Sequence, residues 1–254
     1  MADGNVTRVD LHVKVLDTSV VRRAKKAGLD VLVYAPHFTH LSDIRDEAER
    51  YTDDELVVVP ARECFTGRWN RRRHVLVVDP SEPIPDFLPF EQTMTELDRR
   101  DETVLAPHPE FLTMSVARED IHEYRNVFDA VEVFCPKNTR YHTRRMHEVA
   151  TETGLSTYVS SYAHLPHTVG EVWVEYDVPI ETAEDLRAAL TGERECRHRR
   201  KDGLTHLLKR CGEIAHLGYE NTWERLRRMA LQPCEPTNHR NPRYDDRYNR
   251  RGTH

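Results

Sequence analysis

The sequence has no long hydrophobic run and no closely spaced pair of cysteines. No stretch of its 254 residues approaches about eighteen consecutive apolar positions, and the first residues lack the basic and then apolar order of a secretion signal. The five cysteines are scattered and never spaced as C-x-x-C, which argues against a disulfide framework and a cysteine zinc site. We therefore expect a cytoplasmic protein with reduced thiols and no membrane partner.

Lysine is scarce, and the charge is unevenly distributed. Only 6 of the 37 basic residues are lysine. Residues 1–190 hold 22 basic and 34 acidic residues, whereas residues 191–254 hold 15 basic and 9 acidic ones. Because nucleic-acid binders usually carry a basic stripe on the folded domain itself, this distribution argues against specific nucleic-acid binding without excluding it.

Short apolar runs alternate with longer segments of helical period, a pattern typical of β/α units around a largely parallel sheet. Strands are predicted over residues 9–13, 31–35, 56–61, 74–78, 104–106, 130–134 and 156–160. Helices are predicted between them over residues 19–26, 43–51, 91–99, 118–124 and 141–152, with Gly28 and Gly154 as helix stops. Strands in this number and rhythm favour an α/β barrel over an open sheet.

The chain is long enough for one such barrel, over residues 1–190, with a C-terminal appendage. An extended segment is expected over residues 171–176 and a helix over residues 182–190, followed by a charge run over residues 193–202. Residues 191–232 are then expected to form a helical extension that packs on the barrel, with helices over residues 204–217 and 222–231 and Gly218 as a helix stop. Residues 233–254 have almost no aliphatic side chains and are expected to be disordered.

Polar residues suited to metal binding lie at or near the ends of most predicted strands. His12 and Lys14 are two apart on the first strand and so point the same way. The other positions of this kind are His37, Glu63, His74, His108 and His164. The loops that follow barrel strands converge on one rim, where active sites are built. A carboxylate such as Glu63 that points into a barrel is costly to desolvate without a metal or cation.

The loop between Glu63 and His74 is rich in arginine, whose guanidinium matches phosphate oxygens. Arg68, Arg71, Arg72 and Arg73 are therefore candidates for holding a phosphate, although a solvated basic loop is the simpler explanation for any one of them.

Taken together, these motifs resemble the PHP (polymerase and histidinol phosphatase) superfamily over approximately residues 8–170. That family typically shows D-x-H-x-H, G-L-D-x-x-x-x-T-D-H, a strand ending in G-x-E, then H-I/V-L, A-H-P and S-D-A-H. The resemblance implies a distorted (β/α)7 barrel with up to three metals, usually zinc, manganese or iron, that activate water and hold a phosphate ester. It implies metal ligands at His12, His37, Glu63, His74, His108 and His164.

Three positions depart from the family pattern. Lys14 stands in place of a histidine, Pro36 in place of an aspartate, and Tyr162 in place of the aspartate of S-D-A-H. The resemblance assigns positions 14 and 162 to the same metal site. A protonated ammonium cannot coordinate a metal, but it supplies a positive charge with which Glu63 could pair.

We therefore predict one or two divalent ions rather than three. The site formed by Glu63, His74 and His108 is complete in the sequence. A further site retains His37 and His164, with Asp17 as a speculative third ligand.

Two functions follow from the resemblance. The first is a metal-dependent phosphoesterase that acts on a phosphorylated small molecule or a nucleotide end, with catalytic roles for Lys14, His37, Arg62 and Tyr162. The alternative is a catalytically degenerate barrel that serves as a binding or scaffold module or as an RNA-processing subunit, since one ribonuclease P protein shares the barrel without its metals.

Overall fold

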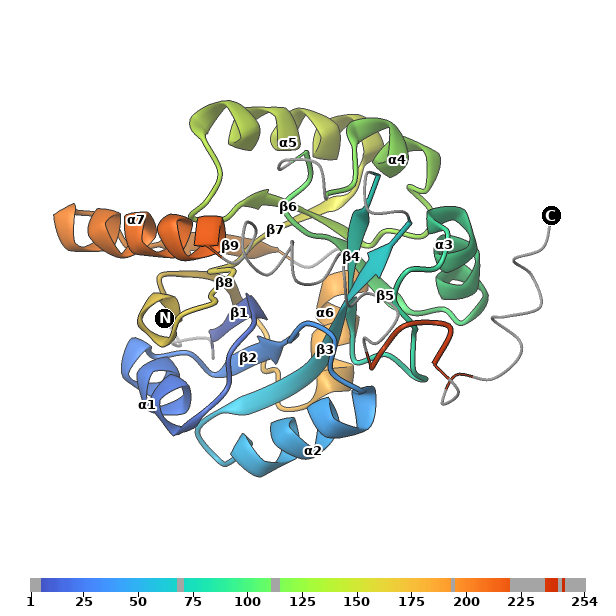
Figure 1. Ribbon diagram of the computed structural model, residues 1–254. Helices are drawn as coiled ribbons and strands as arrows, with labels where there is room; N and C mark the ends of the chain where they lie inside the picture. The colour runs from blue at the N-terminus through green and yellow to red at the C-terminus, as the bar shows by residue number, and fades with distance from the viewer. Residues whose placement is uncertain are drawn as a thin grey trace.

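The computed structural model describes residues 6–67, 71–110, 115–192, 195–219, 236–241 and 244. The seven predicted strands are all present, as β1 (Thr7–Val13), β2 (Val31–Tyr34), β3 (Val57–Thr66), β4 (Arg73–Val78), β5 (Thr103–Ala106), β6 (Ala130–Phe134) and β7 (Ser156–Val159). The strand order of the sheet is β7-β6-β5-β4-β3-β2-β1-β8-β9. Val13 at the end of β1 also bridges to Ala163 beyond β7, so the sheet curves into a nearly closed barrel (Figure 1). The predicted α/β barrel is confirmed.

Helices surround this sheet (Figure 1). They are α1 (Thr18–Ala27), α2 (Leu41–Tyr51), α3 (Phe90–Arg99), α4 (Arg118–Glu123), α5 (Arg140–Thr153), α6 (Ala183–Thr191) and α7 (Leu204–Tyr219), with a short 3-10 helix η1 (Pro166–Thr168). The main core joins the buried Val, Leu and Ile side chains of the strands to helix residues such as Met94, Met146 and Leu186. Aliphatic burial of this extent is the main favourable term in forming the barrel.

Two of the three glycines predicted to end a helix do so. Gly28 and Gly154 end α1 and α5 with left-handed φ angles of 76° and 69°. Gly218 lies inside α7, which continues to Tyr219, so its predicted role as a helix stop is wrong. The helix predicted over residues 222–231 lies outside the described residues.

Strand β4 runs antiparallel to both of its neighbours, an arrangement that the largely parallel pattern did not predict. Its first residues, Arg73 and His74, pair with Thr66 and Phe65 at the C-terminal end of β3. Because β4 runs backwards, a histidine at its start lies at the same rim as the residues that end the parallel strands. This reversal brings His74 toward Glu63.

The sheet is extended by β8 (Val172–Tyr176) and β9 (Cys196–Arg200), which pair antiparallel. The first matches the predicted extended segment, but β9 was expected only as part of a charge run. Charged residues are uncommon in strands, and here they are accommodated by opposite charges across the pair. Arg199 Nε donates to Glu175 Oε2 at 2.8 Å.

Part of the tail expected to be disordered packs against the barrel. The backbone nitrogen of Asp86 donates to the carbonyl of Thr237 at 2.7 Å, and Asp86 also forms an isolated β-bridge with Asn238. Tyr244 packs on Leu88. The reason is the buried carboxylate of Asp86, which accepts a hydrogen bond from the hydroxyl of Thr237. Composition alone does not show this local partner.

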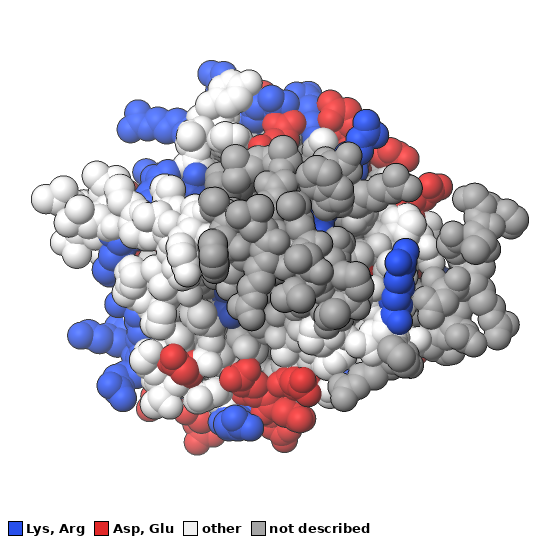
Figure 2. All heavy atoms as spheres, viewed as in Figure 1, with Lys and Arg blue, Asp and Glu red and all other residues white. Residues whose placement is uncertain are grey.

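No helix in the described ranges is long and apolar enough to cross a bilayer. Figure 2 shows acidic side chains gathered along the lower edge of the molecule, over α2, and basic side chains along the left and upper edges.

Candidate metal centre

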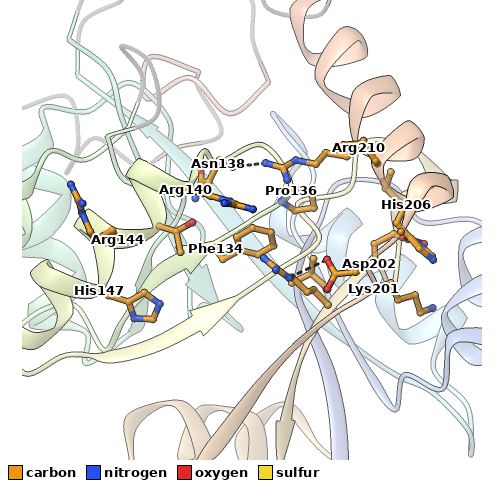
Figure 3. Close-up of a pocket in the computed structure, with 17 residues that line it drawn as sticks. Phe134, Pro136, Asn138, Arg140, Arg144, His147, Lys201, Asp202, His206 and Arg210 are labelled. Atoms are coloured by element: carbon orange, nitrogen blue, oxygen red, sulfur yellow. Dashed lines mark hydrogen bonds and ion pairs between the residues drawn. The ribbon is translucent and has the colours of Figure 1, made fainter.

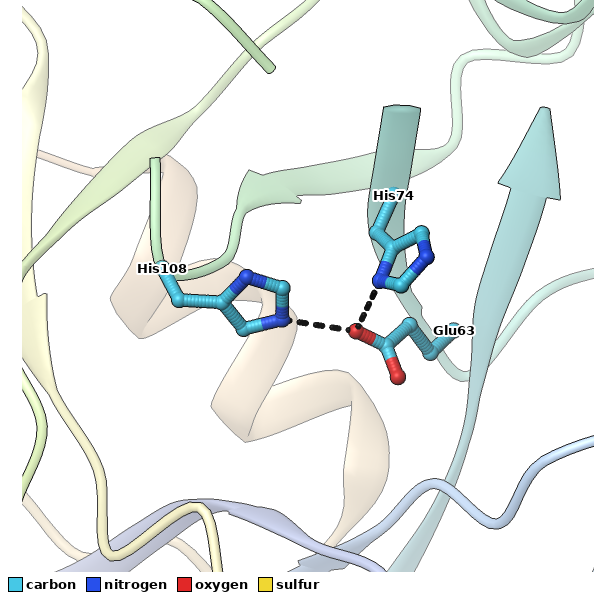
Figure 4. Close-up of side chains that lie close together, drawn as sticks. All are labelled: Glu63, His74 and His108. Atoms are coloured by element: carbon cyan, nitrogen blue, oxygen red, sulfur yellow. Dashed lines mark hydrogen bonds and ion pairs between the residues drawn. The ribbon is translucent and has the colours of Figure 1, made fainter. Parts of the chain in front are cut away.

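Glu63 lies at the centre of a buried cluster, and its side chain is completely shielded from solvent. Its Oε1 atom lies 2.9 Å from His108 Nε2 and 3.2 Å from His74 Nδ1 (Figure 4). One ligand atom from each of these three residues lies within 4.8 Å of the others. Ligands of a tetrahedral zinc ion are about 3.3 Å apart, given bonds of roughly 2.0–2.1 Å. A cation therefore fits among these three residues with small shifts.

The second oxygen of Glu63, Oε2, faces a different set of groups. It accepts a hydrogen bond from the ammonium of Lys14 and lies 2.8 Å from His37 Nε2. His12 Nε2 is 3.9 Å from the same oxygen. Lys14 Nζ also donates to the carbonyl of Ala35 at 2.7 Å, which fixes the ammonium in place. Oε1 of the carboxylate thus faces His74 and His108, whereas Oε2 faces the ammonium of Lys14 together with two further imidazoles.

Two histidines of the cluster have polar atoms that the described residues leave without hydrogen bonds. Both ring nitrogens of His12 and both of His74 are in this state, although the side chains are at most 4% exposed. Leaving a buried polar group unsatisfied costs roughly 1–3 kcal/mol, so such groups mark places where a ligand is expected. Imidazole nitrogens and a carboxylate oxygen are the donor set that zinc, manganese and iron accept. The residues present therefore fit a divalent cation.

The position of His108 is set by polar contacts around it. Its backbone has a φ of 33°, an uncommon conformation for a residue other than glycine. Its backbone nitrogen donates to Glu132 Oε2 at 2.6 Å, and its Nδ1 lies 3.0 Å from Ser115 Oγ. A partner on the second ring nitrogen orients a metal-binding histidine. His108 is therefore held with Nε2 directed at Glu63.

Burial controls the protonation of the histidines. It lowers the pKa of His12 and of His37 well below the usual value, and it lowers that of His108 and His164 to about 4. These imidazoles are consequently neutral near pH 7, which is the form that coordinates metals.

Burial and charge act in opposition on Glu63 and Lys14. Burial alone would raise the pKa of Glu63, but the charge of Lys14 and hydrogen bonds from the histidines outweigh it and hold that pKa well below the usual value. Burial lowers the pKa of Lys14 to about 8, against the opposing pull of Glu63. The pair is an ion pair at neutral pH.

Tyr162 occupies the space between the histidines of the cluster. Its ring centroid lies 4.8 Å from that of His12, 4.6 Å from that of His108 and 4.8 Å from that of His164. A phenol ring therefore packs where the resemblance implies a carboxylate ligand, and Tyr162 separates these imidazoles.

Lys137 is a second buried cation that the sequence analysis missed. Its Nζ atom lies 3.6 Å from the ring centroid of Tyr162, 2.9 Å from His164 Nδ1 and 3.5 Å from Glu213 Oε1. The sequence did contain a signal for this residue, because Lys137 is one of the few lysines and follows closely on β6.

Glu213 reaches the cluster from α7, in the C-terminal extension. Its carboxylate accepts hydrogen bonds from the backbone nitrogen of His164 and from Thr168 Oγ1, each at 2.7 Å. The side chain is completely buried. No local pattern marks this residue, because only the packing of α7 beside η1 brings it to the barrel.

Two other residues that the sequence analysis put forward, Arg62 and Asp17, are bound by groups outside the Glu63 cluster. Arg62 is 1% exposed and is bound by Asp86 Oδ2 at 2.9 Å and by the carbonyl of Thr39 at 2.7 Å. Asp17 caps α1 by accepting from the backbone nitrogens of Ser19 and Val20, so it does not complete a metal site.

Two of the four arginines between Glu63 and His74 are engaged by other side chains. Arg73 is held by Asp120 at 2.5 Å, and the guanidinium of Arg72 lies 4.8 Å from the ring centroid of Phe87. Arg71 is exposed, and Arg68 lies outside the described residues.

A family model matches one segment of this chain, and several solved structures share its fold. Residues 140–194 match the model of the PHP-associated family. PsfC from Pseudomonas syringae has a similar structure, with a TM-score of 0.62 and 18% identity over 85% of this chain and 99% of that chain. So has a two-domain protein from Bacteroides vulgatus that contains a predicted PHP-like metal-dependent phosphoesterase, with a TM-score of 0.58 and 16% identity over 82% and 70% of the two chains.

A lesion-specific endonuclease from Pyrococcus furiosus, EndoQ, also shares the fold, with a TM-score of 0.55 and 16% identity over 75% of this chain and 57% of that chain. No curated protein sequence gives a significant match. The family-model match over residues 140–194 and the shared fold agree with the resemblance to the PHP superfamily that the sequence motifs gave.

Proposed function

We propose that this protein is a metal-dependent phosphoesterase that binds one divalent cation among Glu63, His74 and His108. The observation that carries the proposal is that the two oxygens of the Glu63 carboxylate have different partners. Its Oε1 faces the two imidazoles, while its Oε2 is paired with Lys14. A cation bound there supplies a Lewis acid that polarises a phosphoryl oxygen and makes water more acidic.

The remaining residues of the cluster would position the substrate. Lys14 places a positive charge beside Glu63 without occupying its Oε1 side. His37 has a side chain that is 20% exposed, whereas that of His12 is 0% exposed, so His37 is the better placed of the two to contact an incoming phosphate. Arg62 has no part in this proposal, because Asp86 already holds its guanidinium. Tyr162 is proposed to hold His12, His108 and His164 in position through ring packing.

A phosphorylated small molecule or a nucleotide end is the proposed substrate class. Two structural neighbours, one containing a predicted PHP-like metal-dependent phosphoesterase and the other a lesion-specific endonuclease, support a phosphate ester. The choice among zinc, manganese and iron is left to measurement, since a donor set of histidine and carboxylate accepts all three.

Metal analysis of the purified protein tests the proposal. We expect about one equivalent of zinc, manganese and iron combined, and less than about a tenth of an equivalent after His74→Ala or His108→Ala, since each removes one of three ligands. His122→Ala is the matched control, because His122 is exposed on α4 and contacts Glu152. The hydrolysis of bis(p-nitrophenyl) phosphate should fall in parallel with metal content. Wild-type protein with no bound metal would refute the proposal.

A specific observation favours the second candidate, a degenerate barrel with a binding role. Two ammonium groups, those of Lys14 and Lys137, stand beside Tyr162 and the histidines. A Lys14→His, Tyr162→Asp double variant separates the candidates. If the wild type hydrolyses phosphodiesters, the phosphoesterase is supported; if activity arises only in the repaired variant, the protein is a binding or scaffold module.

A further inference from the structure

A second pocket lies outside the Glu63 cluster, between α5 and α7. It is bounded by the segment that follows β6, the exposed start of α5, the end of β9 and the first turns of α7. Figure 3 shows Arg140 and Arg144 on one side of it and His206 and Arg210 on the other. These side chains come from elements far apart in the sequence, and only the fold brings them together.

The pocket is positive in a chain that is negative overall. Five of its lining residues are Arg or Lys and two are acidic, so its formal charge is +3, whereas the whole chain carries -6. Clefts lined by charge of one sign focus the local field and concentrate ligands of the opposite sign. The pocket therefore selects anions.

The two acidic residues do little to cancel this field. Glu171 is largely buried and is already paired with Arg23 at 2.7 Å and Lys209 at 2.6 Å, neither of which lines the pocket. Asp202 is exposed and pairs with Arg200 at 3.3 Å, a contact of little strength in water. An anion with several charges can displace Asp202 from Arg200.

Two guanidinium groups are held in place by an aromatic ring. Those of Arg200 and Arg210 lie 5.3 Å and 6.0 Å from the ring centroid of Phe134. Arg210 also donates to the carbonyl of Asn138 (Figure 3). Holding these side chains before binding reduces the entropy that a ligand must overcome.

Arg140, on the opposite wall, is exposed, and its guanidinium forms no hydrogen bond or ion pair with the other described residues. Arg144, one turn further along α5, contacts the exposed Glu148 at 3.7 Å and the ring of Tyr141. Guanidinium groups on both walls can thus meet one elongated anion, and each can form paired hydrogen bonds with phosphate oxygens.

We propose that this pocket binds the oligophosphate chain of a small ligand, independently of the metal centre. A single phosphate would satisfy two or three donors, whereas the cations here come from α5, β9 and α7 and surround the pocket. Thr168 lies on the wall shared with the metal centre, because it lines the pocket and donates to Glu213.

Calorimetric titration of the full chain with inorganic tripolyphosphate, in excess chelator and at low salt, tests this proposal. The chelator keeps metal from mediating the contact. We expect one saturable site, with an affinity that falls at least about tenfold in an Arg140→Glu, Arg200→Glu double variant, since two paired phosphate contacts become repulsive. Orthophosphate should bind more weakly than tripolyphosphate.

The matched control is an Arg22→Glu, Arg50→Glu double variant, which makes the same charge change at exposed positions of α1 and α2. It should alter the affinity less than about twofold, because screened charges at a distance contribute little. Glu63→Gln should bind tripolyphosphate like the wild type, which separates this site from the metal centre.

Three results would overturn the proposal. The first is an absence of tripolyphosphate binding by the wild type. The second is an equal loss of affinity in both arginine double variants, which would mean that only the net charge matters. The third is tighter binding of a short single-stranded oligonucleotide than of tripolyphosphate with the same dependence on Arg140 and Arg200, which would assign the pocket to nucleic acid.

Discussion

At the level of single residues, Lys14 defines the character of the metal centre. Its ammonium is 5% exposed and pairs with one oxygen of the fully buried Glu63. Removing one partner of a buried ion pair leaves an uncompensated charge, which usually costs more than the pair itself contributes. Lys14 therefore stabilises the folded protein as long as no metal ion is bound at Oε2 of Glu63.

Lys14→Met should make stability depend on metal. In chelator, we expect the free energy of unfolding to fall by about 3 kcal/mol, the usual cost of breaking a buried pair. Added zinc should stabilise this variant more than the wild type, because Oε2 of Glu63 then faces His37 and His12 without the competing ammonium. Urea denaturation with and without zinc measures both effects.

The control for this prediction is Lys25→Met, since Lys25 pairs with Asp53 on the surface at 2.5 Å. It should cost less than about 1 kcal/mol and show no added dependence on zinc. Equal losses in the two variants would contradict the role given to Lys14.

Arg62 is a buried charged residue with a structural role. Asp86 accepts from Arg62 and from the backbone nitrogen of Phe65, so the pair ties β3 to the segment that precedes α3. Arg62→Met should lower the free energy of unfolding by roughly 3–5 kcal/mol in urea and leave metal content unchanged.

Arg50→Met, at an exposed position on α2, is the comparison and should stay within about 0.5 kcal/mol. Loss of bound metal in Arg62→Met without loss of stability would instead place Arg62 in the metal centre.

At the level of elements, the glycines show where backbone geometry is fixed. Gly170, between η1 and β8, has a φ of 70°, and a Cβ there would lie 2.6 Å from the Cβ of Ala27. Gly154 has a similar φ, but a Cβ there would approach only Arg125 at 3.9 Å. The same left-handed backbone therefore carries a steric clash at one site and none at the other.

Thermal unfolding of three alanine variants tests this distinction. Gly154→Ala should cost about 1–2 kcal/mol for the left-handed conformation alone, and Gly170→Ala clearly more. Gly218→Ala should be neutral or stabilise by up to about 1 kcal/mol, because Gly218 lies within α7 with nothing within 4 Å of its added Cβ. Equal costs at positions 154 and 170 would show that the clash with Ala27 is relieved by movement.

At the level of the whole molecule, two C-terminal segments complete the barrel. Helix α7 delivers Glu213 to the backbone of His164, and residues 236–241 bind at Asp86. Both contacts join residues that are far apart in the sequence. They also bury polar groups that the barrel alone would leave exposed or unsatisfied.

Truncation of the chain after residue 235 should therefore destabilise the barrel. Asp86 loses four hydrogen bonds, two to the hydroxyl and carbonyl of Thr237 and two to the backbone nitrogen and Nδ1 of His239. We expect a loss of about 2 kcal/mol, given roughly 0.5–1.5 kcal/mol per bond, and a fall in Tm of about 4–8 °C. Thr237→Val should show about half of this loss. An unchanged Tm on truncation would mean that the segment contributes nothing to stability.

The sequence by itself determined the positions of the strands up to β8, most of the helices and the family resemblance. Apolar runs and helix stops are local features, and Gly28 and Gly154 act through their own backbone angles. Motifs around Glu63 and His108 were equally readable, because each histidine lies close to a strand end in the sequence.

Only the tertiary structure decided which of these groups meet. The reversal of β4 carries His74 to Glu63, and packing brings Lys137 and Glu213 together beside His164. The pairing of Arg62 with Asp86 likewise assigns that guanidinium to the fold. The physical reason is that Coulomb interactions and hydrogen bonds depend on distance in space, and strand direction and helix docking set those distances across separations that no local pattern records.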